Sequence, residues 1–128
     1  MEEKQNCPFC NLDKGRVAMQ SEHWFATFDQ YPVSPGHMLV IPKRHCPTFF
    51  DLEKEELEEL TGFIFQVKEY LDDRLTKKPD GYNVGCNCGE AAGQTVMHMH
   101  MHVIPRYLGD VENPRGGVRG VIPNKQKY

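Results

Sequence analysis

The feature that most constrains the fold is a strict alternation of histidine with apolar residues in the segment 96–104. Side chains of a β-strand point alternately to opposite faces, so the pattern predicts a strand with one histidine face and one apolar face. The outer two histidines then lie about 13 Å apart, too far for all three to share one metal ion. At least one is free for another task. The histidines are His98, His100 and His102, and the apolar residues are Met97, Met99, Met101 and Val103.

The rest of the chain predicts one long helix and several short strands. A helix is predicted over residues 53–75, because apolar residues recur there at steps of three and four. The 128 residues leave room for one domain. About five strands with one main helix predict an α+β fold with an antiparallel sheet. The helical stripe is Leu57, Leu60, Ile64, Val67 and Leu71, and the other strand segments are 16–20, 23–28, 37–41 and 82–87.

Charge and hydropathy exclude some classes of protein. A formal charge of −3 argues against general nucleic-acid binding. No apolar run reaches the roughly 20 residues that cross a bilayer, and the acidic, polar start is unlike a secretory signal, so we expect a cytoplasmic protein. The tail 111–128 is basic, with Arg115 and Arg119 among its cations. It either attracts a phosphorylated small molecule or is a solvated end.

Five cysteines argue for metal chemistry rather than a disulfide framework. Cys7 and Cys10 form a C-x-x-C motif, Cys46 is alone, and Cys86 and Cys88 form a C-x-C motif. A redox pair would normally open a helix after a strand, whereas Cys7 and Cys10 lie near the N-terminus. This position favours a metal site.

The segment His98-Met99-His100-Met101-His102-Val103-Ile104 resembles the signature of the histidine triad (HIT) superfamily of nucleotidyl hydrolases and transferases. The likeness extends to 29–32, 35–45, the long helix and 93–95, and covers roughly residues 5–108. It implies a HIT-like fold with a five-stranded antiparallel sheet, one long helix and a short one, in a homodimer. We expect a HIT domain over 1–110 and a basic, Gly/Pro-containing extension over 111–128 packed on it. The run 102–106 is nearer the fragile-histidine-triad branch, although the tail departs both from that branch and from the short-tailed phosphoramidase branch.

The resemblance also implies a chemistry. His100 would be the nucleophile that attacks the α-phosphorus of a nucleotide, because a neutral imidazole has a free lone pair near pH 7 and leaves readily. The backbone carbonyl of His98 would select the reactive tautomer, and His102 would stabilise the shifting charge. The other expected substrate contacts are Asn87, Gln94 and Thr95 at phosphate, Asp29 at the ribose (or as a simple turn residue), and Phe9, Leu12 and Phe28 as base-pocket or core residues.

For the metal, the resemblance points to a closed, structural zinc site of two cysteines and two histidines. Its matching residues are Cys7, Cys10, His45 and His98. A competing set replaces the histidines with Cys86 and Cys88, and a third alternative is no metal at all. A divalent cation bound with the polyphosphate is a further expectation.

Several functions remain open at this stage. The leading hypothesis is hydrolysis of a dinucleoside polyphosphate through a nucleotidyl-His100 intermediate, which releases a nucleoside monophosphate. The same residues suit a purine nucleoside phosphoramidase, and transfer to phosphate instead of water is a minor alternative. A zinc-stabilised nucleotide-binding module with little turnover is the non-enzymatic alternative.

Overall fold

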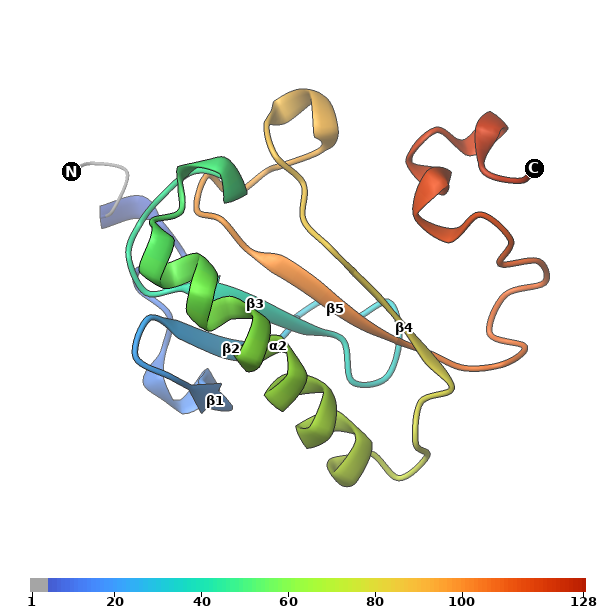
Figure 1. Cartoon of the computed structure of the whole chain (residues 1–128), viewed down its shortest axis with the longest axis horizontal. Helices are drawn as coiled ribbons and strands as arrows, with labels where there is room; N and C mark the ends of the chain where they lie inside the picture. Colours follow the sequence, from blue (N-terminus) through green and yellow to red (C-terminus); the bar gives the residue numbers. More distant parts are fainter. Residues whose placement is uncertain (1–4) are drawn as a thin grey trace.

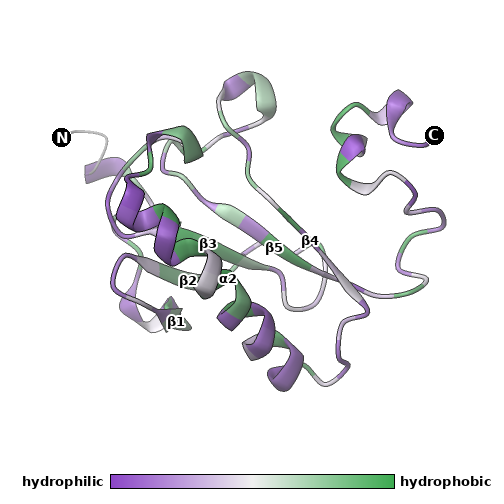
Figure 2. Ribbon diagram, viewed as in Figure 1, coloured by the Kyte–Doolittle hydropathy of each residue, from purple (hydrophilic) through white to green (hydrophobic). Residues whose placement is uncertain are grey.

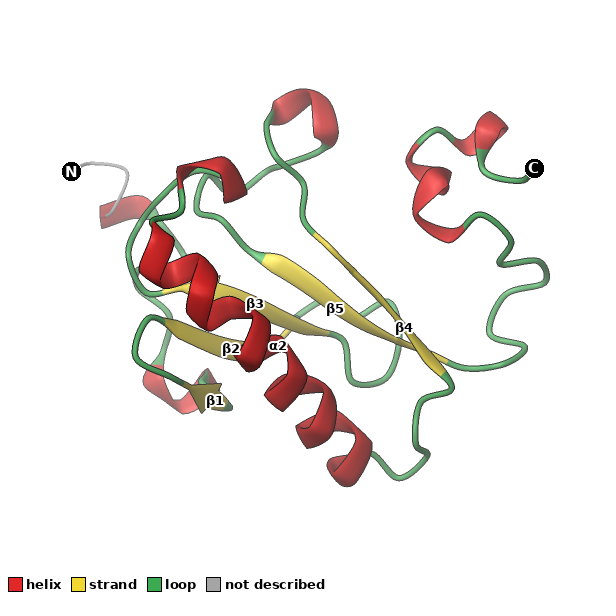
Figure 3. Cartoon of the chain, in the orientation of Figure 1, coloured by secondary structure: helices red, strands yellow, loops and turns green. Residues whose placement is uncertain are grey.

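A five-stranded antiparallel sheet with one long helix on one face forms the body of the protein (Figures 1 and 3). The computed structural model describes residues 5–128. The strand order is β1-β2-β3-β5-β4, and every neighbouring pair is antiparallel. The predicted α+β class and strand number are confirmed. The elements are β1 (Met19–Gln20), β2 (Trp24–Phe28), β3 (Met38–Pro42), α2 (Lys54–Arg74), β4 (Gly81–Gly85) and β5 (Met101–Arg106).

The main core lies between α2 and the sheet, where the apolar side of the helix faces the strands (Figure 2). The helical stripe differs in part from the prediction. Phe63 is buried, whereas Leu57 is 39% exposed. At the start of the helix Glu56 is buried instead: its backbone carbonyl accepts from the indole N–H of Trp24, and its carboxylate accepts from Arg44. The buried side of the first turn therefore carries a charged residue whose polar atoms are all bonded.

The long strand predicted over 96–104 is wrong in its extent. Strand β5 begins only at Met101, and residues 96–100 form an irregular approach to it. The backbone N–H of Met99 donates to the carbonyl of Cys46 in the β3–α2 loop, 2.7 Å away, so it makes no ladder bond. The two-face pattern breaks accordingly, because Met99 is buried and Met97 is 47% exposed.

The C-terminal tail leaves β5 and folds into two short 3₁₀ helices beyond β4 (Figure 1). These helices are Gly117–Val121 and Pro123–Lys125. The guanidinium groups of Arg115 and Arg119 lie over the Tyr128 ring, 5.1 and 4.8 Å from its centroid, and Arg119 also donates to two tail carbonyls. Both arginines therefore hold the tail together. Across residues 5–128, no helix has the length and apolar character needed to span a bilayer.

Candidate active site and metal cluster

His100 lies just before β5, with one ring nitrogen bonded to backbone. Its Nδ1 is 2.9 Å from the carbonyl oxygen of His98. A carbonyl only accepts, so Nδ1 carries the proton and Nε2 of a neutral ring keeps its lone pair. The ring of Phe9 packs edge-on against His100, with centroids 5.0 Å apart. The tautomer expected of a nucleophilic histidine is therefore fixed by local backbone geometry.

A cavity of about 420 Å³ contains the His100 ring in its wall. It lies on the face of the sheet opposite α2, between the N-terminal segment and the Gly-rich loop before β5. Its lining combines apolar and polar side chains, as expected of a site for a nucleoside joined to phosphate. The apolar residues include Phe9, Leu12 and Leu39, and the polar ones include Asp29, Asn87, Thr95 and His102.

Two residues expected at the substrate lie elsewhere. The Gln94 side chain is buried within its own loop, where it accepts from the N–H of Gly89 (2.8 Å) and donates to the carbonyls of Pro47 (2.6 Å) and Val96 (3.0 Å). These bonds occupy its amide, and it does not line the cavity. Phe28 packs near Tyr70 on the helix side of the sheet.

His37 is a site residue to which sequence analysis assigned no role. It is 3% exposed and precedes β3, and its Nε2 lies 2.9 Å from Nδ1 of His102 and 3.4 Å from a carboxylate oxygen of Asp29. Burial lowers the pKa of both His37 and His102, and for His37 the carboxylate only partly offsets it. Both rings are therefore neutral near pH 7. The sequence signal was a polar residue at the start of an otherwise apolar strand.

A second cavity, also about 420 Å³, lies between the sheet and the tail. It shares Asn87 and His102 with the first cavity. Its other walls are mainly apolar and come from the β2–β3 loop, β4, β5 and the tail. They include Val33, Ile104, Val118 and Val121. Open space thus lies on two sides of His102.

Two cysteines and two histidines converge behind the His100 segment. Cys7, Cys10, His45 and His98 each place a potential ligand atom within 4.8 Å of the others. Nδ1 of His98 lies 3.4 Å from both sulfurs and 3.1 Å from Nδ1 of His45, which is 3.2 Å from Sγ of Cys10. A tetrahedral zinc site with normal bond lengths has ligand–ligand distances of about 3.3–3.8 Å. The donor set and its spacing therefore fit zinc.

The orientation of His98 supports this fit. Its ring is fully buried, and Nε2 donates to the carbonyl of Pro42, 2.8 Å away. The proton is thus on Nε2, and the Nδ1 lone pair points into the cluster. The cysteines of the competing set lie outside it: the sulfurs of Cys86 and Cys88 are 3.9 Å from each other and belong to no such group among residues 5–128.

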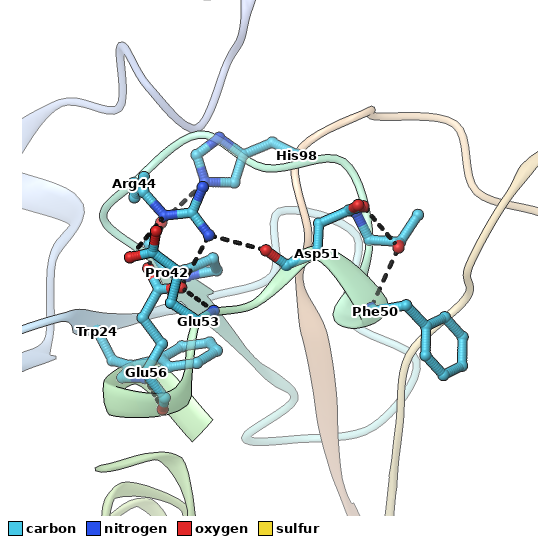
Figure 4. A network of polar contacts seen from close by, with 9 residues as sticks. Trp24, Pro42, Arg44, Phe50, Asp51, Glu53, Glu56 and His98 are labelled. Atoms are coloured by element: carbon cyan, nitrogen blue, oxygen red, sulfur yellow. Dashed lines mark hydrogen bonds and ion pairs between the residues drawn. The ribbon is translucent and has the colours of Figure 1, made fainter. Parts of the chain in front are cut away.

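A polar network holds the loop that carries His45 (Figure 4). Arg44 donates to both carboxylate oxygens of Glu56 in α2, at 3.1 and 2.9 Å, and to the backbone carbonyl of Asp51. Burial raises the pKa of Glu56, but the bonds from Arg44 and from the N–H of Glu53 lower it more, so the carboxylate is ionised. The loop is therefore fixed to the helix N-terminus.

Fold and site together define a histidine triad protein: a small α+β protein in which one short segment places His100 and His102 in the wall of a cavity and His98 in a cluster with two cysteines. The HIT domain family matches residues 13–109, and the chain belongs to this family. An uncharacterised HIT-like protein of Mycoplasma genitalium is 37% identical over 106 residues, which cover 80% of this chain and 74% of that protein.

Two further relatives carry an activity in their names. Bis(5'-adenosyl)-triphosphatase of Dictyostelium discoideum is 37% identical over 80% of this chain and 67% of its own length. AP-4-A phosphorylase of Mycobacterium tuberculosis is 34% identical over 80% of this chain, but over only 52% of its own length.

Solved structures agree with the fold. A hypothetical histidine triad nucleotide-binding protein of Sulfolobus tokodaii matches with a TM-score of 0.74 and 35% identity, over 81% of this chain and 71% of that one. A zinc-bound histidine triad family protein of Mycobacterium smegmatis matches with a TM-score of 0.73 and 32% identity, over 86% and 81% of the two chains.

Proposed function

We propose that this protein is a nucleotidyl hydrolase that cleaves dinucleoside polyphosphates at the α-phosphate through a covalent nucleotidyl-His100 intermediate. The observation that carries the proposal is the His100 ring, whose Nδ1–H is bonded to the carbonyl of His98 and whose other nitrogen is left for a ligand of the cavity. A neutral imidazole so held is a competent nucleophile toward phosphorus.

In the first step, the Nε2 lone pair of His100 forms a bond to the α-phosphorus, and the bond from phosphorus to the bridging oxygen breaks. The electron pair of that bond leaves with the remaining nucleotide, and His102 donates a hydrogen bond toward the oxygen that gains charge. In the second step, water attacks the phosphorus, the P–N bond breaks with its electron pair returning to Nε2 of His100, and the proton that the water loses passes to solvent. The nucleoside monophosphate is released and the imidazole is restored.

The substrate contacts follow from the lining of the first cavity. Asn87 and Thr95 would bind phosphoryl oxygens, Asp29 would accept from ribose hydroxyls, and Phe9 with Leu12 would contact the base. Gln94 as a direct phosphate ligand stays a prediction, and its buried bonds support a different role in shaping the loop 89–94.

The cavity beside the tail favours a substrate with a large group on the far side of the phosphorus, because it shares Asn87 and His102 with the first. A dinucleoside polyphosphate has such a group, and two relatives are named for acting on such compounds. The phosphoramidase alternative keeps the same residues with an amine as leaving group. The phosphorylase relative keeps the transferase alternative open.

We also propose that Cys7, Cys10, His45 and His98 hold a structural zinc ion, because their distances suit its tetrahedral geometry. When bound, zinc would tie the N-terminal segment to the stretch that carries His100. The extension 111–128 as part of the same domain, the homodimer, the divalent cation with the substrate and the cytoplasmic location stay predictions.

The test is a comparison of the wild type with His100→Asn on diadenosine triphosphate and on an adenosine phosphoramidate. We expect turnover by the variant to fall by about 10⁴-fold or more, since no nucleophile remains, while adenosine monophosphate still binds. Mass spectrometry of quenched wild-type reactions should find one adenylyl group on His100. Retained hydrolysis by His100→Asn would overturn the assignment, and a wild type that binds but never turns over would favour the binding module. The two kcat/KM values decide between the substrate classes.

A further inference from the structure

His37 and His102 belong to a chain of hydrogen bonds whose first donor is a backbone N–H. The N–H of Val33 donates to Nδ1 of His37, 3.2 Å away. On the opposite side of the ring, Nε2 of His37 lies 2.9 Å from Nδ1 of His102. Both rings belong to the side of the sheet that faces the two cavities, since Leu39 of β3 pairs with His102 of β5.

The backbone donor determines which ring nitrogen of His37 carries the proton. A backbone N–H cannot accept, so Nδ1 of His37 must be the acceptor and carry no proton. The neutral ring then has its proton on Nε2. The carboxylate of Asp29, 3.4 Å from the same Nε2, has no proton to donate and favours the same tautomer.

The proton on His37 in turn settles the tautomer of His102. An N–H at Nδ1 of His102 would face the N–H of His37 at 2.9 Å, which is repulsive. Nδ1 of His102 must therefore accept, and its single proton lies on Nε2, the ring atom that is left for the cavity. A neutral histidine without such a neighbour has two tautomers, and only one of them donates from Nε2.

We propose that His37 is a positioning residue that fixes His102 as an Nε2–H donor toward the reacting phosphoryl group. The tautomer follows from the contacts of His37 and His102 alone, whereas its consequence for turnover rests on the proposed function. His37 acts through His102, so its loss changes the donor presented to substrate while His100 remains intact.

The direct test is the tautomer of His102 in protein labelled with ¹⁵N-histidine, read by NMR at neutral pH. In the wild type we expect a single species with the proton on Nε2. His37→Leu removes the donor, so His102 should become a mixture or change to the Nδ1–H form. His37→Gln keeps an N–H donor near the former Nε2 and should preserve the wild-type signal. An unchanged His102 signal in His37→Leu would overturn the proposal.

A matched control and a kinetic readout separate positioning from folding. Ser34→Ala alters the same turn, where the hydroxyl donates to the carbonyl of Pro105, without contact with either ring. It should leave the tautomer unchanged, and a changed tautomer would contradict the specific role of His37. His37→Leu should lower kcat by about 10–100-fold with little change in KM, and His37→Gln should restore much of it. If the wild type has no turnover, the proposed function fails while the NMR result still decides the role of His37.

Discussion

His98 and His100 are two residues apart, yet they belong to two different regions of the molecule. The His98 ring is fully buried, and its Nδ1 faces two sulfurs and a second imidazole. The His100 ring is in the wall of a cavity, and its Nδ1 is bonded to the backbone of His98. The cluster holds the side chain of His98, and the backbone carbonyl of His98 orients the His100 ring.

This difference shows how one short histidine motif contributes both to the cluster and to the cavity. In a regular strand all three histidines would share one face. The irregular stretch 96–100 turns the first histidine into the cluster and leaves the next at the cavity, while His102 is already within β5. Damage to the cluster should therefore act on stability first, and damage to the cavity on chemistry alone.

The largest expected effect comes from emptying the cluster. Cys7→Ser with Cys10→Ser should remove the zinc and cost more than about 4 kcal/mol, the range typical of a lost metal site. Thermal unfolding should shift down by about 10 °C or more, together with loss of zinc by metal analysis. The matched control is Cys86→Ser with Cys88→Ser, which should keep both. If the wild type purified under reducing conditions holds no zinc, the metal proposal fails.

The next effect tests the support of the cluster from α2. Glu56→Gln removes the charge that binds Arg44, and we expect a loss of about 1.5–3 kcal/mol, the value of hydrogen bonds to a charged group. Urea unfolding with an unchanged slope measures it. Glu58→Gln, on the exposed side of the same helix, is the control and should be near neutral. Equal effects of both variants would show that the Arg44 network adds nothing specific.

A smaller effect is expected at Phe9, which touches both regions. Its ring lies 5.0 Å from the His100 centroid and 5.9 Å from that of His98, edge-on in each case. Phe9→Leu keeps an apolar side chain but loses the aromatic contacts, which are worth about 0.5–1.5 kcal/mol. We expect kcat/KM to fall about 3–10-fold at unchanged zinc content. A loss of zinc from this variant would show instead that Phe9 mainly supports the metal cluster.

The sequence was sufficient for the fold class because it depends on hydrophobic periodicity. The strands around Trp24–Phe28 and Met38–Pro42 and the helix Lys54–Arg74 follow from apolar patterns and turn residues. The cluster residues Cys7, Cys10, His45 and His98 were also identified, through the family resemblance rather than through spacing.

What the sequence missed depends on contacts between distant segments. The bond from Met99 to Cys46 ends the predicted strand early, and no local pattern encodes it. The inward turn of Glu56 depends on Trp24 and Arg44. The role of His37 is visible only when β3 and β5 are paired. In each case a polar group bonds to a residue far away in the sequence, and the periodicity of apolar residues carries no information on such contacts.

The smallest expected effect concerns the pH dependence of stability, which has opposite signs for the buried histidines and for the more exposed His23. Burial lowers the pKa of His37 and His102, so the stability that each contributes is present above the unfolded pKa of about 6.5 and is lost as pH falls. The hydrogen bond that His23 donates to the Glu59 carboxylate raises the pKa of His23. The stability that His23 contributes is therefore present below about 6.5 and is lost as pH rises through the folded pKa. NMR titration should place His23 above 6.5 and the two cavity rings below it. Glu59→Gln should return only the His23 pKa toward 6.5. A cavity ring that titrates above 6.5 would contradict the buried, neutral pair, because a charged His37 could no longer accept from the backbone of Val33.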